Sequence, residues 1–188
     1  MHWRRLGLIG SLLVVAAGLG LWRWNTWLEH SQDIPIRAAS QRYGIEPALI
    51  KAVVWRESHF HPSARGRVGE LGLMQLRAAA AFEWAQAERV SGFVHEECLD
   101  PKTNTLAGTW YLRKLLKRYA RTDNPLPYAL ADYNAGRQNV LKWNSGPAQT
   151  NSAAFLGQIR FPGTRAYVLS VLRRYERYRP EFSSSRSS

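Results

Sequence analysis

Glu57 is an acidic residue in a sequence context that suits proton transfer. Val53 and Ile50 precede it by one and two helical turns, so Glu57 continues an apolar stripe along one helix face. Its place in the last turn sets its charge against the negative end of the helix dipole, and partial desolvation acts in the same direction. Both effects favour the protonated carboxyl group that a general acid requires. The same spacing also fits a solvent-facing glutamate at a frayed helix end, and geometry alone leaves both interpretations open.

The segment after this helix is rich in turn-forming residues. They are Pro62, Gly66, Gly69 and Gly72. They predict an irregular loop over residues 61–73. His59 and His61 lie close together, but no third ligand follows at a suitable spacing. Cys98 is the only cysteine, which excludes a Cys-rich metal site, so we expect neither a metal nor a cofactor.

Helices are expected to position these residues, because the alternating runs typical of strands are scarce. A first helical pattern ends at Tyr43-Gly44, and the helix of the apolar stripe opens around Pro47 and stops before Pro62. Further helices are expected from Leu76 through the alanine run, from Asp100-Pro101, from near Pro127 to Gly136, and from about Thr164. Residues 144–163 are typical of a loop, and the tail after Phe182 is expected to be disordered. The predicted fold class is mainly α.

The amino terminus is typical of a membrane segment. Arg4 and Arg5 precede an uncharged run of seventeen residues, Leu6 to Trp22, which is the lower limit for a helix that spans a bilayer. The run also fits the apolar core of a cleavable signal peptide or a buried core helix. We favour an uncleaved anchor, because no small-x-small cleavage site follows and further tryptophans lie where an aromatic belt would be. Residues 23–34 are expected to form a short polar linker.

The charge of the chain points to anionic surroundings. Lys and Arg outnumber Asp and Glu by 26 to 14, which gives a formal net charge of +12. Such a surface attracts nucleic acid, anionic lipid or an anionic cell wall. The chain lacks zinc-finger spacing, a basic region leading into heptads and an arginine-rich arm, so we expect no nucleic-acid partner. The eight Trp and eight Tyr suit both sugar binding and core packing.

Several motifs follow one another along the chain at definite spacings. They are Glu57-Ser58 with Pro62 and Ala64, Gly69 to Gln75, Asp100-Pro101 with Asn104, Gly108 and Tyr111-Leu112, Tyr133-Asn134-Ala135-Gly136, and Thr164 to Val168. Together they resemble the signature of the lytic transglycosylases related to goose-type lysozyme. The resemblance covers roughly residues 35–178. It implies a lysozyme-like (goose-type) helical catalytic domain over residues 31–180. An anchor and linker over residues 1–30 would precede it, and a tail over residues 181–188 would follow.

The resemblance also implies which residues form the site. Glu57 matches the single catalytic acid of the family. The residues at substrate-binding positions are Ser58, Met74, Gln75, Tyr133, Asn134 and Tyr167. Tyr133 and Asn134 match residues at the reacting sugar, whereas plain core packing is the alternative for Met74 and Tyr167.

The chain departs from the family pattern at three positions. Asp132 stands where the family usually has Ala, Gly163 where it has Glu, and Glu70 where a small residue is common. Asp132 could place an extra carboxylate near the site, but a solvated helix residue is the preferred interpretation, because Asp is rarely buried. Gly163 removes a polar contact, so we expect weaker or different substrate binding on that side.

Ordinary glycosidases use two carboxylates, whereas only Glu57 is clearly marked in this chain. The resemblance implies that Glu57 protonates the β-1,4 glycosidic oxygen between N-acetylmuramic acid and N-acetylglucosamine, while the substrate's acetamido group stabilises the positive charge. Glu57 then takes the proton of the muramic 6-hydroxyl, which closes on the anomeric carbon. An intramolecular nucleophile has a high effective concentration, so the product is a 1,6-anhydro end and no water is consumed.

We therefore expect a lytic transglycosylase that acts on peptidoglycan glycan strands. Its localisation would be the inner membrane, through a single-pass anchor over residues 6–22, with the catalytic domain in the periplasm. One alternative is a hydrolytic, lysozyme-like muramidase in which Asp132 activates water. Another is an inactive glycan-binding scaffold of an envelope machine, for which the retained Glu57 would have no use. A nucleic-acid binder fits least.

Overall fold

The computed structural model describes residues 2–183 and the side chains of residues 15–183. Its α-helices are α1 (His2–Ser31), α2 (Asp33–Tyr43), α3 (Pro47–Ser58), α4 (Ala78–Glu88), α5 (Pro101–Arg118), α6 (Pro125–Ala135), α7 (Arg137–Trp143), α8 (Ser152–Gln158) and α9 (Pro162–Ser183). The short 3-10 helices η1 (His95–Leu99) and η2 (Gly146–Gln149) lie between them. The predicted mainly α class is confirmed.

Local sequence signals set several helix boundaries as predicted. Pro47 occupies the first turn of α3, where its missing N–H and fixed φ do no harm. The Asp100 side chain caps α5 by accepting a hydrogen bond from the Thr103 N–H at 2.8 Å. Gly44 ends α2 with φ +67°, a left-handed conformation that glycine adopts without strain.

The helix expected from Leu76 begins two residues later, at Ala78. The reason lies in backbone pairing. The Leu76 N–H donates to the Leu71 carbonyl and the Leu71 N–H donates to the Leu76 carbonyl, both at 3.0 Å. This reciprocal bridge holds Leu76 in an extended conformation and closes the preceding loop.

The segment over residues 144–163 contains η2 and α8, so the prediction of a loop there was wrong in part. The Asn151 side chain caps α8 at the Ala154 N–H, and Phe155 is fully buried, so one cap and one core residue suffice to form this short helix. The sequence reading also missed α7, which buries Val140 and Trp143 about one turn apart.

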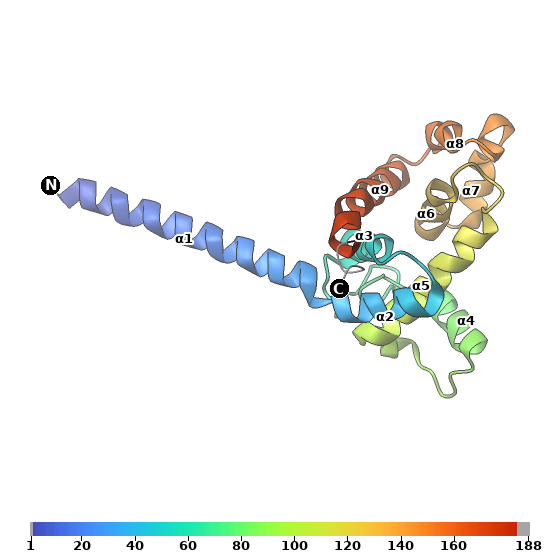
Figure 1. Ribbon diagram of the computed structural model, residues 1–188, viewed down its shortest axis with the longest axis horizontal. Coiled ribbons are helices and arrows are strands. Elements are labelled where there is room, and N and C mark those ends of the chain that lie inside the picture. The colour runs from blue at the N-terminus through green and yellow to red at the C-terminus, as the bar shows by residue number, and fades with distance from the viewer. Residues whose placement is uncertain (1, 184–188) are drawn as a thin grey trace.

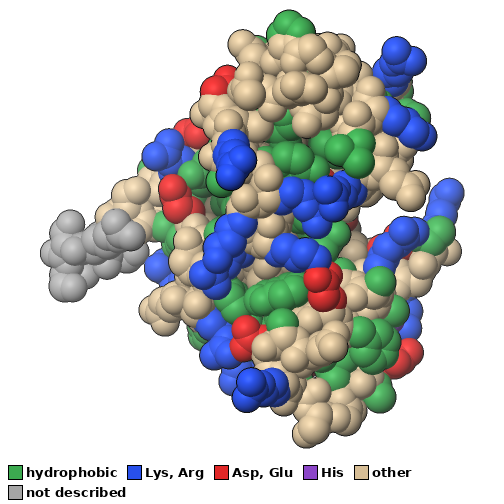
Figure 2. Space-filling view, turned by 90° about the vertical axis from the view of Figure 1, so that its right-hand side faces the viewer, with side chains coloured by type: hydrophobic (Ala, Val, Ile, Leu, Met, Phe, Trp, Pro, Cys, Tyr) green, Lys and Arg blue, Asp and Glu red, His purple; other side chains and the backbone are tan. Residues whose placement is uncertain are grey.

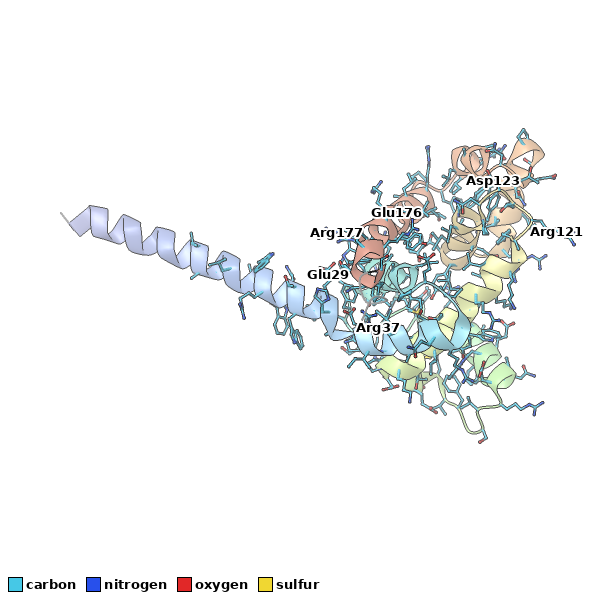
Figure 3. The ribbon with its side chains drawn as sticks, in the orientation of Figure 1. Glu29, Arg37, Arg121, Asp123, Glu176 and Arg177 are labelled. Atoms are coloured by element: carbon cyan, nitrogen blue, oxygen red, sulfur yellow. The ribbon has the colours of Figure 1, made fainter. Side chains whose placement is uncertain are left out.

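The predicted polar linker over residues 23–34 is also corrected, because α1 continues through it to Ser31. Residues 23–31 contain neither proline nor glycine to break the helix. The last turns of α1 contact the domain: Glu29 accepts a hydrogen bond from the Tyr178 hydroxyl and lies 3.6 Å from Arg174 of α9. Figure 3 labels Glu29 at this junction with α9.

The proposed anchor over residues 6–22 lies within α1, and the side chains of residues 6–14 fall outside the described part of the chain. Among the residues that the structure describes, no helix combines the length and apolarity needed to cross a membrane. From residue 15 onward α1 exposes large apolar side chains. They are Val15, Leu19, Leu21, Trp22, Trp24 and Trp27. The disordered tail expected over residues 181–188 is corrected at its start, because α9 continues to Ser183, and residues 184–188 lie outside the described part of the chain.

The core of the domain forms around α3, which packs against α9 (Figure 1). Most residues of α3 are buried, including the charged Lys51. Its ammonium group lies 2.9 Å from an Asp33 carboxylate oxygen and 3.2 Å from a Glu181 carboxylate oxygen. Because a buried charge requires partners, this cluster joins α2, α3 and α9 at the end of the domain where α1 enters.

The basic character of the chain appears on the surface turned away from α1. Figure 2 shows Lys and Arg side chains spread across that face, with fewer acidic side chains between them. Part of the excess of Lys and Arg over Asp and Glu thus lies on this face of the domain, where it favours contact with anionic polymers.

Replacing Gly108 by Ala should destabilise the fold, because α5 passes close to Met74 at this glycine. A Cβ on Gly108 would lie 2.4 Å from the Met74 sulfur and 2.9 Å from its Cβ. Overpacking of this kind costs about 1–3 kcal/mol of unfolding free energy. Urea unfolding of Gly108→Ala measures it. The control is Gly157→Ala in α8, where the added Cβ meets open space among the described residues and stability should stay the same or rise slightly.

Candidate active site

A cavity of about 370 Å³ opens beside the carboxyl-terminal end of α3. The loop before α4, the first turn of α4, helix α5 and the end of α6 supply its other walls. Its lining residues are Glu57, Glu70, Gln75, Leu76, Arg77, Ala79, Ala80, Tyr111, Asp132, Tyr133, Asn134, Ala135 and Gly136. Carboxyl, amide and phenol groups therefore meet around a space of the size that holds a small ligand or part of a chain.

Glu57 is the next-to-last residue of α3 and is partly buried. Its Oε1 accepts a hydrogen bond from the Tyr167 hydroxyl at 2.7 Å. Burial raises the pKa of Glu57 to about 7, because the charged form loses hydration. The Tyr167 hydrogen bond and the positive charge of Arg56 lower this pKa, and the negative charge of Glu70 raises it. Glu57 can thus both hold and release a proton near neutral pH.

Tyr167 comes from α9 and is buried against Arg56, whose guanidinium lies 5.4 Å from the tyrosine ring centre. Burial and the neighbouring Glu57 carboxyl raise the pKa of the Tyr167 hydroxyl well above its usual value. The phenol therefore stays protonated and remains a donor to Glu57. This contact fixes one carboxyl oxygen of Glu57.

One side chain, the fully buried Asn104 of α5, holds the loop beside Glu57 from the interior of the domain. Its Oδ1 accepts from the Met74 N–H at 2.7 Å. Its Nδ2 donates to the carbonyl oxygens of Leu71 at 2.8 Å and Cys98 at 2.7 Å. Asn104 thereby bonds to three interior backbone groups, one of which, the Leu71 carbonyl, also accepts from the Leu76 N–H.

Helix α6 also contacts this loop, through Tyr133. The Tyr133 hydroxyl donates to the Met74 carbonyl oxygen at 2.7 Å, and the Tyr133 ring packs 5.6 Å from that of Tyr111. Gln75 follows with φ +46°, and its Nε2 donates to the Gly72 carbonyl at 2.8 Å and the Ala64 carbonyl at 3.2 Å. These contacts hold Gln75 in a strained conformation at the cavity wall.

The structure brings most of the predicted site residues together. Gln75, Tyr133 and Asn134 line the cavity with Glu57. Asn134 is exposed, and its Oδ1 accepts from the Thr164 hydroxyl at 2.8 Å, which ties α6 to the start of α9. Tyr167 lies behind Glu57 and touches it directly.

Two other predicted substrate-binding residues have inward-facing side chains. Met74 is fully buried in the core, so its side chain packs away from the cavity. Its backbone supports the neighbouring residues that line the cavity. The Ser58 hydroxyl donates back to the Val54 carbonyl at 3.1 Å and is also buried. Their role in substrate binding stays a prediction, whereas their structural role is to support Gln75, Tyr133 and the end of α3.

The expectation that Asp132 is a solvated helix residue was wrong, because only 2 % of it is exposed. Its Oδ2 lies 2.5 Å from an Arg118 nitrogen and accepts from the Tyr119 hydroxyl at 2.7 Å. Both partners come from the end of α5 and compensate the loss of hydration. Asp132 therefore joins α5 to α6, and its engaged carboxylate is poorly suited to activate water.

Sequence reasoning did not assign three further residues of the cavity to the site. Glu70 was noted only for its unusual position, Tyr111 was named only as part of the Tyr-Leu motif, and Arg77 was not named. The position of these residues, in or next to the loop and in the helix of the Tyr-Leu motif, was the sequence signal that could have assigned them to the site. Gly163, the other departure, lies exposed at the start of α9.

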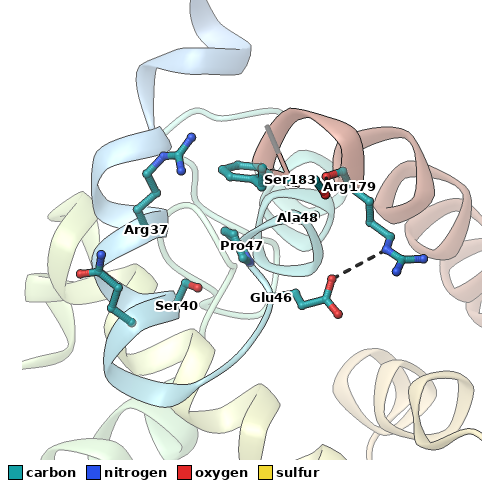
Figure 4. A pocket seen from close by; sticks show the side chains of 9 residues that line it. Arg37, Ser40, Glu46, Pro47, Ala48, Arg179 and Ser183 are labelled. Atoms are coloured by element: carbon teal, nitrogen blue, oxygen red, sulfur yellow. Dashed lines mark hydrogen bonds and ion pairs between the residues drawn. The ribbon is translucent and has the colours of Figure 1, made fainter. Parts of the chain in front are cut away.

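A second cavity of about 500 Å³ lies between α2, the start of α3 and the end of α9. Figure 4 shows Glu46 and Arg179 in its wall, paired at 3.8 Å. Glu46 is the acidic residue in that lining, and its neighbours are mostly basic, small or apolar. The Glu57 cavity, with its raised pKa and converging polar groups, is therefore the better candidate site.

Comparison with known proteins places this geometry in context. The family model described as "Transglycosylase SLT domain" matches residues 34–156. The soluble lytic murein transglycosylase of Escherichia coli is 32 % identical over 130 residues, and the membrane-bound lytic murein transglycosylase C of Pectobacterium atrosepticum is 40 % identical over 119 residues. An inactive mutant of lytic transglycosylase Slt from Pseudomonas aeruginosa superposes with a TM-score of 0.72 at 25 % identity.

These relatives are longer than the chain. The alignments cover 68 % and 57 % of the chain but only 20 % and 32 % of the two curated relatives. The superposition covers 80 % of the chain and 24 % of the Pseudomonas protein. The similarity thus concerns one domain of larger proteins.

Replacing Glu57 by Gln should stabilise the fold above neutral pH. The folded pKa of about 7 exceeds the ordinary 4.5, so the folded state binds the proton more tightly and loses stability as the pH rises from 4.5 to 7. The neutral amide avoids this cost, which corresponds to about 3 kcal/mol. Urea unfolding at pH 8 and pH 4 measures the difference. The gain should be present at pH 8 and absent at pH 4, and an equal effect at both values would contradict the burial of the charge.

Proposed function

The chain belongs to the transglycosylase SLT domain family, and we propose that it is a peptidoglycan lytic transglycosylase in which Glu57 is the general acid and base. The observation that carries this proposal is the state of Glu57. Its pKa lies near 7, and it stands in the wall of a cavity lined with amide and phenol groups. A group with that pKa can give up and take back a proton within one turnover.

The first step is protonation of the glycosidic oxygen between N-acetylmuramic acid and N-acetylglucosamine. The Glu57 proton moves to that oxygen, the C1–O bond breaks, and the acetamido group of the muramic residue stabilises the positive charge at C1. The Tyr167 hydroxyl then stabilises the carboxylate left on Glu57 through its 2.7 Å hydrogen bond.

The second step uses the same carboxylate as a base. It accepts the proton of the muramic 6-hydroxyl, and that oxygen bonds to C1 to form the 1,6-anhydro end. Glu57 ends as it began, protonated, and no water is consumed. Because the nucleophile belongs to the substrate, no second carboxylate is required to activate it.

Gln75, Tyr133 and Asn134 are proposed to hold the sugars next to Glu57. All three line the cavity, and Tyr111 adds a second aromatic ring beside Tyr133. Because loop and helix contacts already fix Gln75 and Tyr133, little side-chain freedom is lost on binding. Met74 and Ser58 would act indirectly, by supporting the backbone that carries the cavity-lining residues.

The engaged Asp132 weakens the hydrolytic alternative. A water-activating base needs an available carboxylate, whereas Asp132 is buried with Arg118 and Tyr119. The scaffold alternative would leave the raised pKa of Glu57 without a use. The non-hydrolytic reaction agrees best with both observations.

We further propose that α1 anchors the protein in the inner membrane, with the catalytic domain in the periplasm. Arg4, Arg5 and the uncharged run from Leu6 to Trp22 support an anchor. The tryptophans Trp22, Trp24 and Trp27 are exposed, as an aromatic belt requires. The relative from Pectobacterium carries "membrane-bound" in its name.

Digestion of purified peptidoglycan in ¹⁸O-labelled water tests the reaction. We expect muramic ends that lack one water and carry no label, because the 6-hydroxyl replaces water as the nucleophile. Glu57→Gln should lower the rate by at least about 100-fold, the usual contribution of general acid catalysis. Glu176→Gln, at an exposed carboxylate of α9, is the control and should keep full activity. Labelled reducing ends would instead identify a hydrolase.

Fractionation of cells that express the full chain tests the anchor. The protein should stay in the membrane pellet after alkaline carbonate, which removes peripheral proteins. Changing Leu19 and Leu21 to Arg adds two charges to the run and should move the protein to the soluble fraction, because each costs a few kcal/mol in lipid. Leu141→Arg, at an exposed position of α7, is the matched control. Release of the unchanged chain by carbonate would contradict the anchor.

A further inference from the structure

The wall of the Glu57 cavity contains another carboxylate, that of Glu70. It arises from the loop before α4, at a position where a small residue is common in the family. Unlike Asp132, which Arg118 and Tyr119 engage from α5, Glu70 is held only by its own loop and by Arg77. Its charge is therefore the acidic feature of the cavity that the reaction described above leaves without a role.

The loop holds Glu70 in a defined place. Its Oε2 accepts from the Val68 N–H at 3.1 Å, and its Oε1 lies 3.2 Å from Nε of Arg77. Gly66 makes the room for it, since a Cβ at Gly66 would lie 2.2 Å from that same Oε2. The Glu70 side chain is only 22 % exposed, so this carboxylate is a built part of the wall and not a freely moving surface group.

Arg77 compensates the Glu70 charge only in part. Its side chain is 64 % exposed, and ion pairs in contact with water are weak because water screens them. A net negative field from Glu70 therefore reaches across the cavity, and its effect on Glu57 is to raise the pKa of that carboxyl.

The other groups that face Glu57 act differently. Arg56, on the same helix, and the Tyr167 hydroxyl from α9 both lower the pKa of Glu57. Tyr133 from α6 is partly buried and stays neutral, because burial of its hydroxyl raises the pKa of that group. Among the charged neighbours, Glu70 is thus the one that opposes Arg56.

We propose that Glu70 is a positioning residue that keeps the proton on Glu57 by charge, and that Arg77 limits this effect. The proposal rests on the proposed function, because it matters only if Glu57 acts as an acid. Glu70 acts through Glu57 and does not touch the reacting atoms. Burial is the main cause of the raised pKa of Glu57, and the pair therefore adjusts the pH at which the enzyme loses its acid form.

Two single variants should shift the pH dependence in opposite directions. Glu70→Gln removes the negative charge but keeps the length and an acceptor for the Val68 N–H, so the alkaline limb of the kcat profile should move about half a pH unit lower. Arg77→Met removes the positive charge but keeps an apolar stem, so the limb should move higher. In both variants kcat on the acid side of the limb should stay within about threefold of the wild-type value.

A control and a second measurement separate charge from structure. Glu88→Gln breaks a similar Arg–Glu pair, with Arg42 on the outer surface, and should leave the limb in place. Titration of the ¹³C-labelled Glu57 carboxyl by NMR should show the same opposite shifts in the two cavity variants. This titration needs no turnover, so it tests the coupling even if the chain proves to be a hydrolase or inactive.

Opposite shifts in both measurements would support the proposal. Shifts in the same direction, or no shift in either variant, would overturn it. A large loss of kcat at every pH in Glu70→Gln, with the limb unmoved, would also overturn it and would make Glu70 a direct participant. Failure of the proposed function would be recognised by different results. These are full activity of Glu57→Gln, or labelled reducing ends from the wild-type protein.

Discussion

The buried amide of Asn104 is the interaction on which the site depends. An irregular loop can lie against a core only if its backbone groups find partners. One side chain from α5 provides two of them, at Met74 and Leu71, and also bonds to Cys98 of η1. With the loop held in this way, Tyr133 can bond to it from α6 and Gln75 can face the cavity. The wall of the candidate site is thus an extension of the packing of α5, and the site and the stability of the fold share the same contacts.

Three carboxylates stand around the cavity, and their surroundings give them different tasks. Glu57 is partly buried beside a neutral phenol, so it retains a proton. Asp132 is buried more deeply but meets a guanidinium and a phenol, so its charge is compensated and it joins two helices. Glu70 is mostly shielded from water but pairs with an exposed arginine, so part of its field remains. Residue type alone would have treated the three as equivalent.

Much of this arrangement could be predicted where the determinants are local. The Pro47 start, the Asp100 cap and the Gly44 end follow from single residues, and the stripe that leads to Glu57 follows from helical spacing. The failures involve distant partners. Burial of Asp132 depends on Arg118 of another helix, and the docking of the end of α1 on the domain depends on contacts of Glu29 with α9. No pattern within one segment contains that information.

The junction between α1 and the domain holds the helix in one orientation relative to the domain. A flexible linker over residues 23–34 would have an end-to-end distance of about 20 Å and would let the domain move relative to α1. The helix instead runs unbroken to Ser31, where Glu29 meets Tyr178 and Arg174, and the Lys51 cluster locks the adjoining turn of α2. The orientation of the cleft relative to the axis of α1 is therefore fixed. If the outer part of that helix lies in a membrane, as proposed, the domain would reach only those glycan strands that lie at one height above it.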